Sequence, residues 1–207
     1  MKKINKLLIL IPFLILGCKS SLIEEARLLQ RIDTLDMNIY SNEGEKIYSI
    51  SSPNTSYNKG NQIFNLKETT INLYKEEKIK YIINSDESRL YNNNKLVELI
   101  GNVKFRNIDQ DNDILYADSF IWSIDKSTYL LSGNVKFENN NIILTSNKAT
   151  MNSEEIIEFF NPVKYTIKNV NNEKVYEINS ENAFYNINTN SLKFGSKDKR
   201  VRTNIYF

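Results

Sequence analysis

Acidic side chains cluster in one short stretch of the sequence, Asp109-Gln-Asp111-Asn-Asp113, which begins like a calcium-binding loop. Such a loop needs a glycine at its sixth position and a bidentate glutamate at its twelfth. Here those positions hold Ile114 and Phe120. Because both required residue types are missing, the stretch predicts a hairpin turn, and we expect no metal site.

The rest of the chain offers little for covalent chemistry. It contains no histidine and a single cysteine, Cys18. This composition excludes Ser-His-Asp and Cys-His catalysis, His-based zinc or iron sites and any disulfide within the chain. A carboxylate pair of the glycosidase kind remains open, but no spacing of Asp or Glu favours it. We therefore expect no catalytic residue, no cofactor and no enzyme activity.

The charge balance argues against a nucleic-acid partner. The chain has 27 basic and 25 acidic side chains, a formal net charge of +2. Lys2, Lys3 and Lys6 lie within the first 17 residues, which carry no acidic side chain. Without that segment the balance is slightly negative, whereas nucleic-acid binding needs a basic surface.

Residues 1–17 have the layout of a secretory signal peptide, with a basic start, an apolar run over 7–17 and a small residue before the cut. As a helix this run would span roughly 17 Å, too little for a bilayer core of about 30 Å. The sequence Ile15-Leu16-Gly17-Cys18 resembles the lipobox of bacterial lipoproteins, which implies cleavage after Gly17 and lipidation of Cys18. An uncleaved anchor, or an ordinary signal with an incidental cysteine, remains an alternative.

Residues 18–46 are expected to hold the lipidated cysteine, a tether and a short amphipathic helix over 21–32, with an ordered tether as the alternative to the helix. The apolar residues at helical spacing are Leu22, Ile23, Ala26, Leu29 and Ile32. The third part, residues 47–207, is expected to be the folded domain.

Three similar segments recur in the chain: ELIGNVKF at 98–105, LLSGNVKF at 130–137 and EFFNPVKY at 158–165. Alternate residues in each are apolar, which predicts a strand with one face in a core. The expected inward residues are Leu99, Val103, Phe105, Leu131, Val135, Phe137, Phe159, Val163 and Tyr165. The expected outward residues include Lys104, Lys136 and Lys164. Pro162 is also outward and removes a ladder donor, which predicts an edge or a bulge there.

A second phrase, with a step of three residues followed by a step of two, alternates with these segments. Its copies are Ser52-x-x-Thr55-x-Tyr57, Ala117-x-x-Phe120-x-Trp122, Ser146-x-x-Ala149-x-Met151, Ser180-x-x-Ala183-x-Tyr185 and, more loosely, Asp86-x-x-Arg89-x-Tyr91. A step of three breaks the two-residue period of a strand, so each copy should kink or bulge at the same place. The repeated unit is therefore a bent strand, a turn, a straight strand and a turn, about five times over.

Repetition at about 30 residues indicates stacked supersecondary units that share a core. A solenoid, a sandwich or a roll of two facing sheets would each satisfy this pattern. We expect one all-β domain that is extended along its stacking axis.

The paired phrases LYADSFIWSIDKSTYLLSGNVKF (115–137) and ILTSNKATMNSEEIIEFFNPVKY (143–165) resemble the repeated unit of the LptA, LptC and LptD amino-terminal jellyroll domains of lipopolysaccharide export. Chain length and a single N-terminal membrane attachment are most similar to the LptC family. The resemblance implies an open β-jellyroll of two facing antiparallel sheets at the periplasmic face of the inner membrane. The lipid anchor is expected from the lipobox instead, whereas many LptC proteins keep a transmembrane helix. The resemblance also implies a relay of lipopolysaccharide from the permease subunits of an inner-membrane ABC transporter to an LptA-like periplasmic jellyroll.

In such a roll the nine inward residues would line a groove for acyl chains. Gly101 and Gly133 would leave room for acyl carbons or permit close sheet packing. From the alternation alone, a closed, dry sandwich core that needs no ligand is the favoured explanation of the same residues, and the family resemblance is what favours the groove. The outward lysines could meet lipid phosphates or simply keep the sheet face soluble.

The end of the chain alternates up to its last residue, which predicts a terminal strand. Its partner-facing candidates are Val201, Thr203, Ile205 and Phe207. Such a strand is either a docking edge for the next jellyroll or an ordinary last strand that completes its own sheet. Two other functions also remain open for the whole chain: a free periplasmic bridge similar to LptA, and a structural or adaptor lipoprotein with a solid sandwich.

Overall fold

The computed structural model describes residues 28–91, 96–109, 113–140, 142–169, 171, 173–196 and 200–206, and these form an all-β structure, as the alternation predicts. The strands are β1 (Leu29–Ile32), β2 (Leu35–Tyr40), β3 (Lys46–Ser52), β4 (Asn54–Asn58), β5 (Ile63–Lys75), β6 (Lys78–Tyr91), β7 (Leu96–Asn107), β8 (Ile114–Ser123), β9 (Thr128–Asn139), β10 (Ile142–Met151), β11 (Ile156–Lys168), β12 (Lys174–Asn186), β13 (Ser191–Gly195) and β14 (Arg202–Ile205). The described part of the chain has no helix of the length and apolarity that a membrane span requires.

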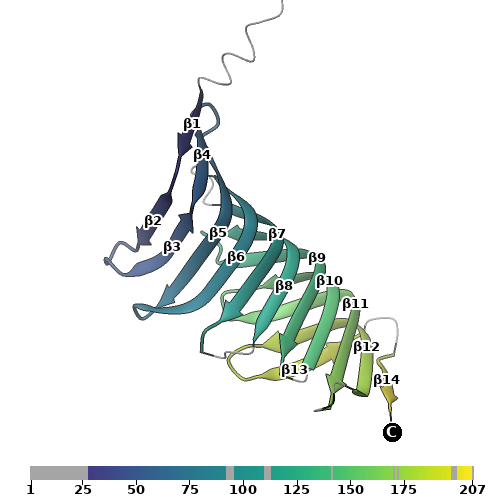
Figure 1. The fold of residues 1–207 in the computed structure, drawn as a ribbon. Coiled ribbons are helices and arrows are strands. Elements are labelled where there is room, and N and C mark those ends of the chain that lie inside the picture. The colour runs from purple at the N-terminus through teal and green to yellow at the C-terminus, as the bar shows by residue number, and fades with distance from the viewer. Residues whose placement is uncertain are drawn as a thin grey trace, which may run out of the picture.

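All of these strands belong to one antiparallel sheet whose order largely follows the chain. From β5 to β13 each strand pairs with the next one, so the strands stack along a long axis (Figure 1). β4 pairs with β5 and β1 with β4, while β3 branches from β5 and carries β2, and β14 branches from β12. The sheet is open, since β1 and β13 lie at opposite ends of this order.

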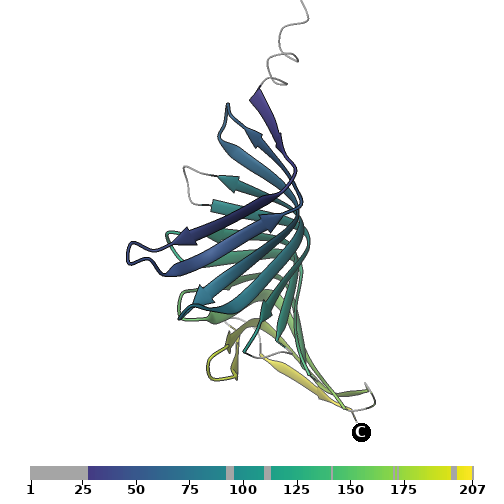
Figure 2. The same cartoon turned by 60° about the vertical axis from the view of Figure 1, so that its left-hand side comes forward.

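Each long strand bends near its middle, and the bends line up across the sheet. The pairing register shifts between Ile100 and Val103 in β7 and between Tyr116 and Ser119 in β8, for example. We call this line the crease; it passes through Glu68, Asp86, Asn102, Asp118, Asn134, Asn147, Pro162 and Glu181. In Figure 2 the strands meet along one side and spread apart toward the other. The sheet is therefore folded onto itself.

The crease divides the sheet into two facing walls. Wall I contains β1, β4 and β13, together with the halves of β5 to β12 on the same side of the crease. Wall II contains β2, β3 and β14, together with the halves of β5 to β12 on the other side. Strand β5 shows the division, because residues 63–67 pair with β4 and residues 70–73 pair with β3. The expected pair of facing antiparallel sheets is thus confirmed, and the two are halves of one continuous sheet.

Both strands of the repeated unit bend, whereas the sequence predicted a bend in only one of them. The bends expected from the step of three occur in β8 and β10, where the pairing register shifts. In β12 the two-residue step from Asn182 to Ser180 is kept, and the extra residue lies in β11. The segments expected to be straight, in β7, β9 and β11, also bend, at Gly101–Asn102, Gly133–Asn134 and Asn161–Pro162. Pro162 lies in a bulge, as predicted, and its strand is an internal one between β10 and β12.

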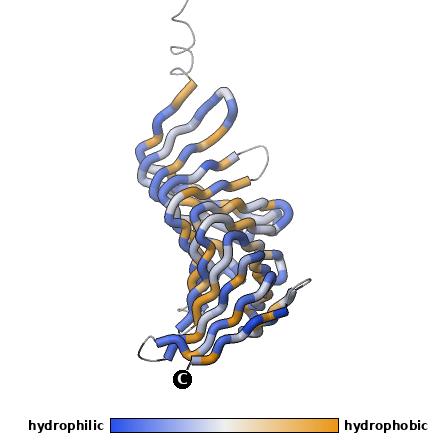
Figure 3. The backbone as a smooth tube through the Cα atoms, turned by 90° about the vertical axis from the view of Figure 1, so that its right-hand side faces the viewer, coloured by the Kyte–Doolittle hydropathy of each residue, from blue (hydrophilic) through white to orange (hydrophobic). Residues whose placement is uncertain are grey.

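One hydrophobic core fills the space between the walls. It runs from Tyr48 in β3 to Ile187 just after β12, and it draws on the inward faces of both walls. Figure 3 shows the alternation that produces it, with short hydrophobic and hydrophilic segments following each other along the strands. Burial of these alternate apolar side chains is what holds the folded sheet closed.

The sheet begins earlier in the chain than residue 47. β1 pairs with β4 and β2 pairs with β3, so part of the segment expected to be a tether belongs to the sheet. The short helix expected over 21–32 is wrong for residues 29–32, because their backbone groups pair with β4 instead. The remainder of that helix, the signal segment 1–17 and Cys18 lie outside the described residues.

Candidate functional site

The space between the walls, which we call the slot, corresponds to the groove that the inward residues of the repeated strands are expected to line. All nine inward residues named there line it, and each is at most 6% exposed. Their inward orientation is therefore confirmed. In this conformation the slot is filled by these side chains themselves, which form part of the single core cluster.

Aromatic side chains make the contacts between the walls. The ring of Phe105 in wall II lies 6.1 Å from that of Phe120 in wall I. Farther from the crease, Tyr48 meets Trp122 with ring centroids 4.9 Å apart. Phe105 and Phe120 come from the adjacent strands β7 and β8. Tyr48 and Trp122 come from β3 and β8, which are four steps apart in the order of the sheet. The strands of the two walls therefore cross, and contacts distant from the crease join segments that are far apart in sequence.

The apolar lining continues to both ends of the roll and becomes more accessible there. At the N-terminal end the half-buried side chains that pack on the core are Leu35, Met37, Ile39 and Phe64. At the C-terminal end they are Ile167, Tyr176, Ile178, Leu192 and Phe194. An apolar track thus extends along the whole length of the slot and reaches solvent at its two ends.

The repeated glycines serve the crease rather than the slot. Gly133 has φ +74°, and a Cβ built on it would lie 2.5 Å from Asp118 Oδ2. The same carboxylate accepts a hydrogen bond of 2.8 Å from the side-chain amide of Asn134. Gly101 repeats this arrangement with Asp86 and Asn102. The expectation that these glycines make room for acyl carbons is therefore not supported, because carboxylates occupy the space in front of them.

Serines at the start of the second repeated phrase also stabilise the crease. The hydroxyl of Ser146 donates to the backbone carbonyl of Lys148 across the bulge, at 2.9 Å. Ser52, Ser85 and Ser180 each make the equivalent bond to the carbonyl two residues on. The copy of the second phrase in β6 therefore begins at Ser85, one residue before Asp86, where the sequence comparison had placed it. The hydroxyl thus joins the two sides of the bend with a side-chain hydrogen bond.

The side of the slot opposite the crease, where the hairpins between strands lie, is closed by polar contacts; we call it the mouth. Lys80 at the start of β6 in wall II forms an ion pair with Glu155 in the β10–β11 turn of wall I. The two side chains are only 12% and 15% exposed. Burial works to raise the pKa of Glu155, but the hydrogen bond and charge of Lys80 outweigh it and the pKa is lowered. The pair is therefore ionised and partly desolvated.

A second polar contact crosses the mouth. The hydroxyl of Tyr185 in wall I donates to a carboxylate oxygen of Asp113 in wall II, at 3.1 Å. Asp113 is 5% exposed and also accepts from the side-chain amide of Asn139. Burial raises the pKa of Asp113. The acidic stretch that resembles a calcium loop thus ends in a wall-to-wall contact, and the described residues hold no cluster suited to a metal.

The outward lysines have partners on the outer face. Lys136 pairs with Glu138 at 2.6 Å and Lys164 pairs with Glu177 at 2.9 Å. Lys164, together with Asn179 and Lys174, lowers the pKa of Glu177 to about 2. The Lys104 ammonium lies 5.9 Å from the centre of the Tyr116 ring. Local ion pairs and ring contacts thus account for these lysines without a ligand.

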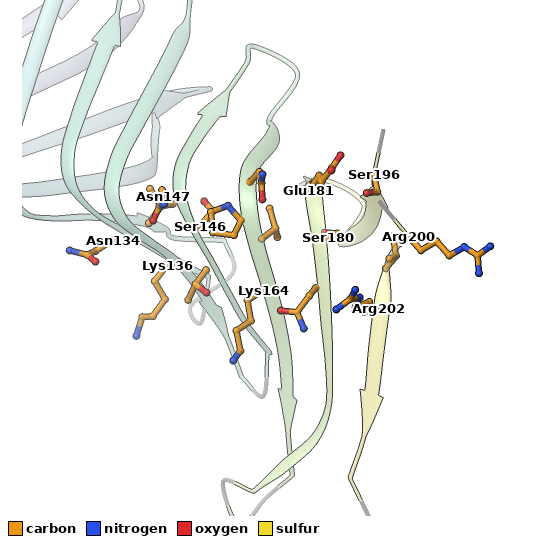
Figure 4. A pocket seen from close by; sticks show the side chains of 17 residues that line it. Asn134, Lys136, Ser146, Asn147, Lys164, Ser180, Glu181, Ser196, Arg200 and Arg202 are labelled. Carbon is orange, nitrogen blue, oxygen red and sulfur yellow. The ribbon is translucent and has the colours of Figure 1, made fainter. Parts of the chain in front are cut away.

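A cleft of about 1110 Å³ lies near the C-terminal end of the crease (Figure 4). Lys136, Lys164 and Arg202 reach it from β9, β11 and β14, among several asparagine and serine side chains. Among the strands that the structure describes, β14 pairs only with β12, and its four residues are all exposed. Thr203 and Ile205 therefore lie on a free edge strand, next to the exposed Val201, and Phe207 lies outside the described residues.

Comparison with known protein families gives a match over residues 30–157, to the family described as lipopolysaccharide-assembly, LptC-related. No curated protein matches the chain. The matched segment spans β1 to the start of β11, and so includes most of the crease, both walls and the Lys80–Glu155 pair. Because the match covers more than half of the 207 residues, the chain belongs to the LptC-related family of lipopolysaccharide-assembly proteins.

Proposed function

We propose that the chain is a non-enzymatic relay for lipopolysaccharide, in which the acyl chains travel in the slot while the sugar remains in solvent outside the mouth. Family membership supports a role in lipopolysaccharide transport at the cell envelope. The observation that carries the proposal is the apolar lining, which runs without a break from the N-terminal to the C-terminal end.

The physical need for such a lining is large. Each methylene group that leaves water is worth about 0.8 kcal/mol, so a lipid with several acyl chains needs continuous cover on its path. The repeated strands offer similar apolar side chains at successive steps, for example Val103, Val135 and Val163. Because each step resembles the next, movement along the slot changes the free energy of the bound lipid little.

Loading requires the walls to part, because the slot is filled by its own side chains. At the crease the walls are connected by the backbone of every long strand, whereas at the mouth they are joined by side-chain contacts. Separation at the mouth therefore leaves the sheet intact. The acyl chains would then replace wall-to-wall contacts such as that between Tyr48 and Trp122.

The ends of the roll suit different partners. In the proposed arrangement, the lipidated Cys18 holds the N-terminal end at the periplasmic face of the inner membrane, beside the permease subunits of the ABC transporter. The free edge of β14 at the other end would pair with an LptA-like jellyroll, since an exposed edge strand can extend a sheet into another protein. A mature chain found without lipid on Cys18 would instead favour a free periplasmic bridge.

The experiment places a photocrosslinking residue at Val135 or Phe137, inside the slot, and at Lys136 or Glu138 on the same strand as outward controls. In cells, we expect lipopolysaccharide adducts at the two inward positions and few or none at the outward ones. The amount and melting temperature of each variant show whether it folds. Absence of adducts from all the inward positions of folded variants would contradict the relay.

A second function, a structural or adaptor lipoprotein with a solid core, is favoured by the low exposure of the slot residues. It predicts that no slot position captures lipid, while exposed positions on β14 capture protein. The relay also predicts protein capture on β14, at Thr203 for example, so the slot positions Val135 and Phe137 are the ones that separate the two functions.

A further inference from the structure

The mouth is closed by an ion pair where apolar side chains would seal it at lower cost. Taking two charges out of water is expensive, and well-packed apolar residues often replace a buried ion pair without loss of stability. Lys80 and Glu155 nevertheless face each other across the mouth with side chains 12% and 15% exposed. They are 75 residues apart in sequence and belong to different walls. The arrangement suggests that the charges have a use when the walls are apart.

The position of Lys80 matches the place where a lipid headgroup would lie. In the relay proposed above, acyl chains occupy the slot and the sugar emerges at the mouth. The ammonium of Lys80 is at this boundary, 5.2 Å from the ring centre of Tyr81, which is itself buried in the slot. A phosphate on the first sugars of a glycolipid would meet Lys80 as soon as the chains entered.

We propose that Lys80 binds a phosphate of the transported glycolipid, and that Glu155 holds the same ammonium while the slot is empty. This inference rests on the proposed relay function. An ammonium accepts a phosphate in place of a carboxylate with similar charge-assisted hydrogen bonds. When an anionic lipid parts the walls, Lys80 therefore keeps a compensating charge, and Glu155 moves into solvent with its turn.

The exchange also gives the slot a means of selecting its cargo. A neutral lipid that opened the mouth would separate Lys80 from Glu155 and leave the ammonium without a partner beside apolar surface. Such an unpaired charge is a penalty that an anionic lipid avoids. Apolar lining alone would accept any acyl chain, so the discrimination resides in this pair.

The test uses the full chain and its one tryptophan, Trp122, as the reporter. Trp122 is 4% exposed and contacts Tyr48 of the other wall, so its emission changes when the walls part. The probes are a bisphosphorylated acylated glucosamine disaccharide, the same lipid without its phosphates, and inorganic phosphate alone. The variants are Lys80→Met, Lys80→Arg and Glu155→Gln, with Lys136→Met as the control, because Lys136 pairs with Glu138 on the outer face.

We expect Lys80→Met to weaken binding of the phosphorylated lipid by roughly tenfold or more, and to strengthen binding of the dephosphorylated lipid, because no ammonium is then left unpaired. Glu155→Gln should strengthen binding of the phosphorylated lipid, because the competing carboxylate is gone, and Lys80→Arg should retain the preference. Lys136→Met should behave as the unsubstituted chain. Since Glu155→Gln moves affinity in the opposite direction from Lys80→Met, poor folding of one variant cannot imitate the pattern.

Three results would overturn the inference. If Lys80→Met and Glu155→Gln shift the affinity for both lipids equally, the pair is only a closure and does not bind phosphate. If inorganic phosphate alone changes the Trp122 emission, the site takes free phosphate and not a lipid. If neither lipid binds the unsubstituted chain, the relay itself fails, an outcome distinct from the first, in which both lipids still bind.

Discussion

The two sides of the slot join the same walls by different means. At the crease, eight strands pass from one wall into the other, and each bend is held by local contacts such as those of Asp118 with Asn134. At the mouth, the walls meet through side chains that come from distant parts of the sequence, Lys80 with Glu155 and Asp113 with Tyr185. The crease is part of the backbone, whereas the mouth is an interface.

This difference shows which side of the filled slot would part in the proposed relay. A hinge requires one edge that stays connected and one that separates. Backbone continuity supplies the first at the crease. The mouth supplies the second, because an ion pair and a hydrogen bond can be exchanged for contacts with a ligand or with water. Changes at the crease should therefore affect folding, and changes at the mouth should mainly affect opening.

The largest effect is expected from a side chain at the crease. Gly133→Ala should lower the free energy of unfolding by about 3 kcal/mol, since the residue must hold φ +74° and its Cβ would meet both Oδ2 and Cβ of Asp118. Gly195→Ala is the matched control, because the nearest atom to its Cβ is 3.8 Å away. Urea denaturation of both variants measures the difference. Equal losses in the two would mean that the glycine of the crease is not needed for the bend.

At the mouth, removal of one charge should have a smaller effect on stability. Lys80→Met leaves Glu155 partly buried without its partner and should cost about 2 kcal/mol of unfolding free energy. The double change Lys80→Met with Glu155→Leu should recover most of this loss, because an apolar pair fits the same place. Lys136→Met, on the exposed pair, should stay within about 0.5 kcal/mol of the unsubstituted chain. A double variant no more stable than Lys80→Met would show that the contact has a packing role that apolar residues cannot fill.

A finer comparison at the crease separates backbone strain from hydrogen bonding. Asn134 has φ 46° and donates to Asp118. Asn134→Ala loses the bond and strains the backbone, and should cost about 1 to 2 kcal/mol. Asn134→Gly loses the bond alone and should cost less than Asn134→Ala. Thermal melts of the two variants show which one loses more stability. A larger loss in Asn134→Gly than in Asn134→Ala would mean that the bend does not depend on the left-handed backbone of this residue.

The alternation in the sequence was sufficient to orient the slot residues, because a strand with one buried face must place alternate side chains inward. It did not show that β7 and β9 bend, since Gly101 and Gly133 keep the inward parity of their strands. The sequence did contain a pattern that marks these bends. Asp86 precedes Asn102 by the same number of residues as Asp118 precedes Asn134, and each pair forms a hydrogen bond at its bend. The Lys80–Glu155 pair had no such signal, because it depends on how the two walls cross. Leu29 and Ile32 have the spacing of one helix face, and pairing of their backbone with β4 overrode that local pattern.

Acid should open the mouth while the crease remains folded, which is the smallest of these effects and the most specific. The pKa of Glu155 in the folded chain is lowered from an ordinary value near 4.5, so its contribution to stability is fully present above about pH 4.5 and is lost as the pH falls through the lowered value. Asp113 has a raised pKa and acts in the opposite sense, because its protonation in acid removes a burial penalty. The Lys80–Glu155 contact should therefore open first. Acrylamide quenching of Trp122 should increase as the pH falls below about 4.5 in the unsubstituted chain, and in Glu155→Gln it should lack this step. A step that persists in Glu155→Gln would place the acid-sensitive contact elsewhere, and the mouth could then no longer be distinguished from the crease by its charges.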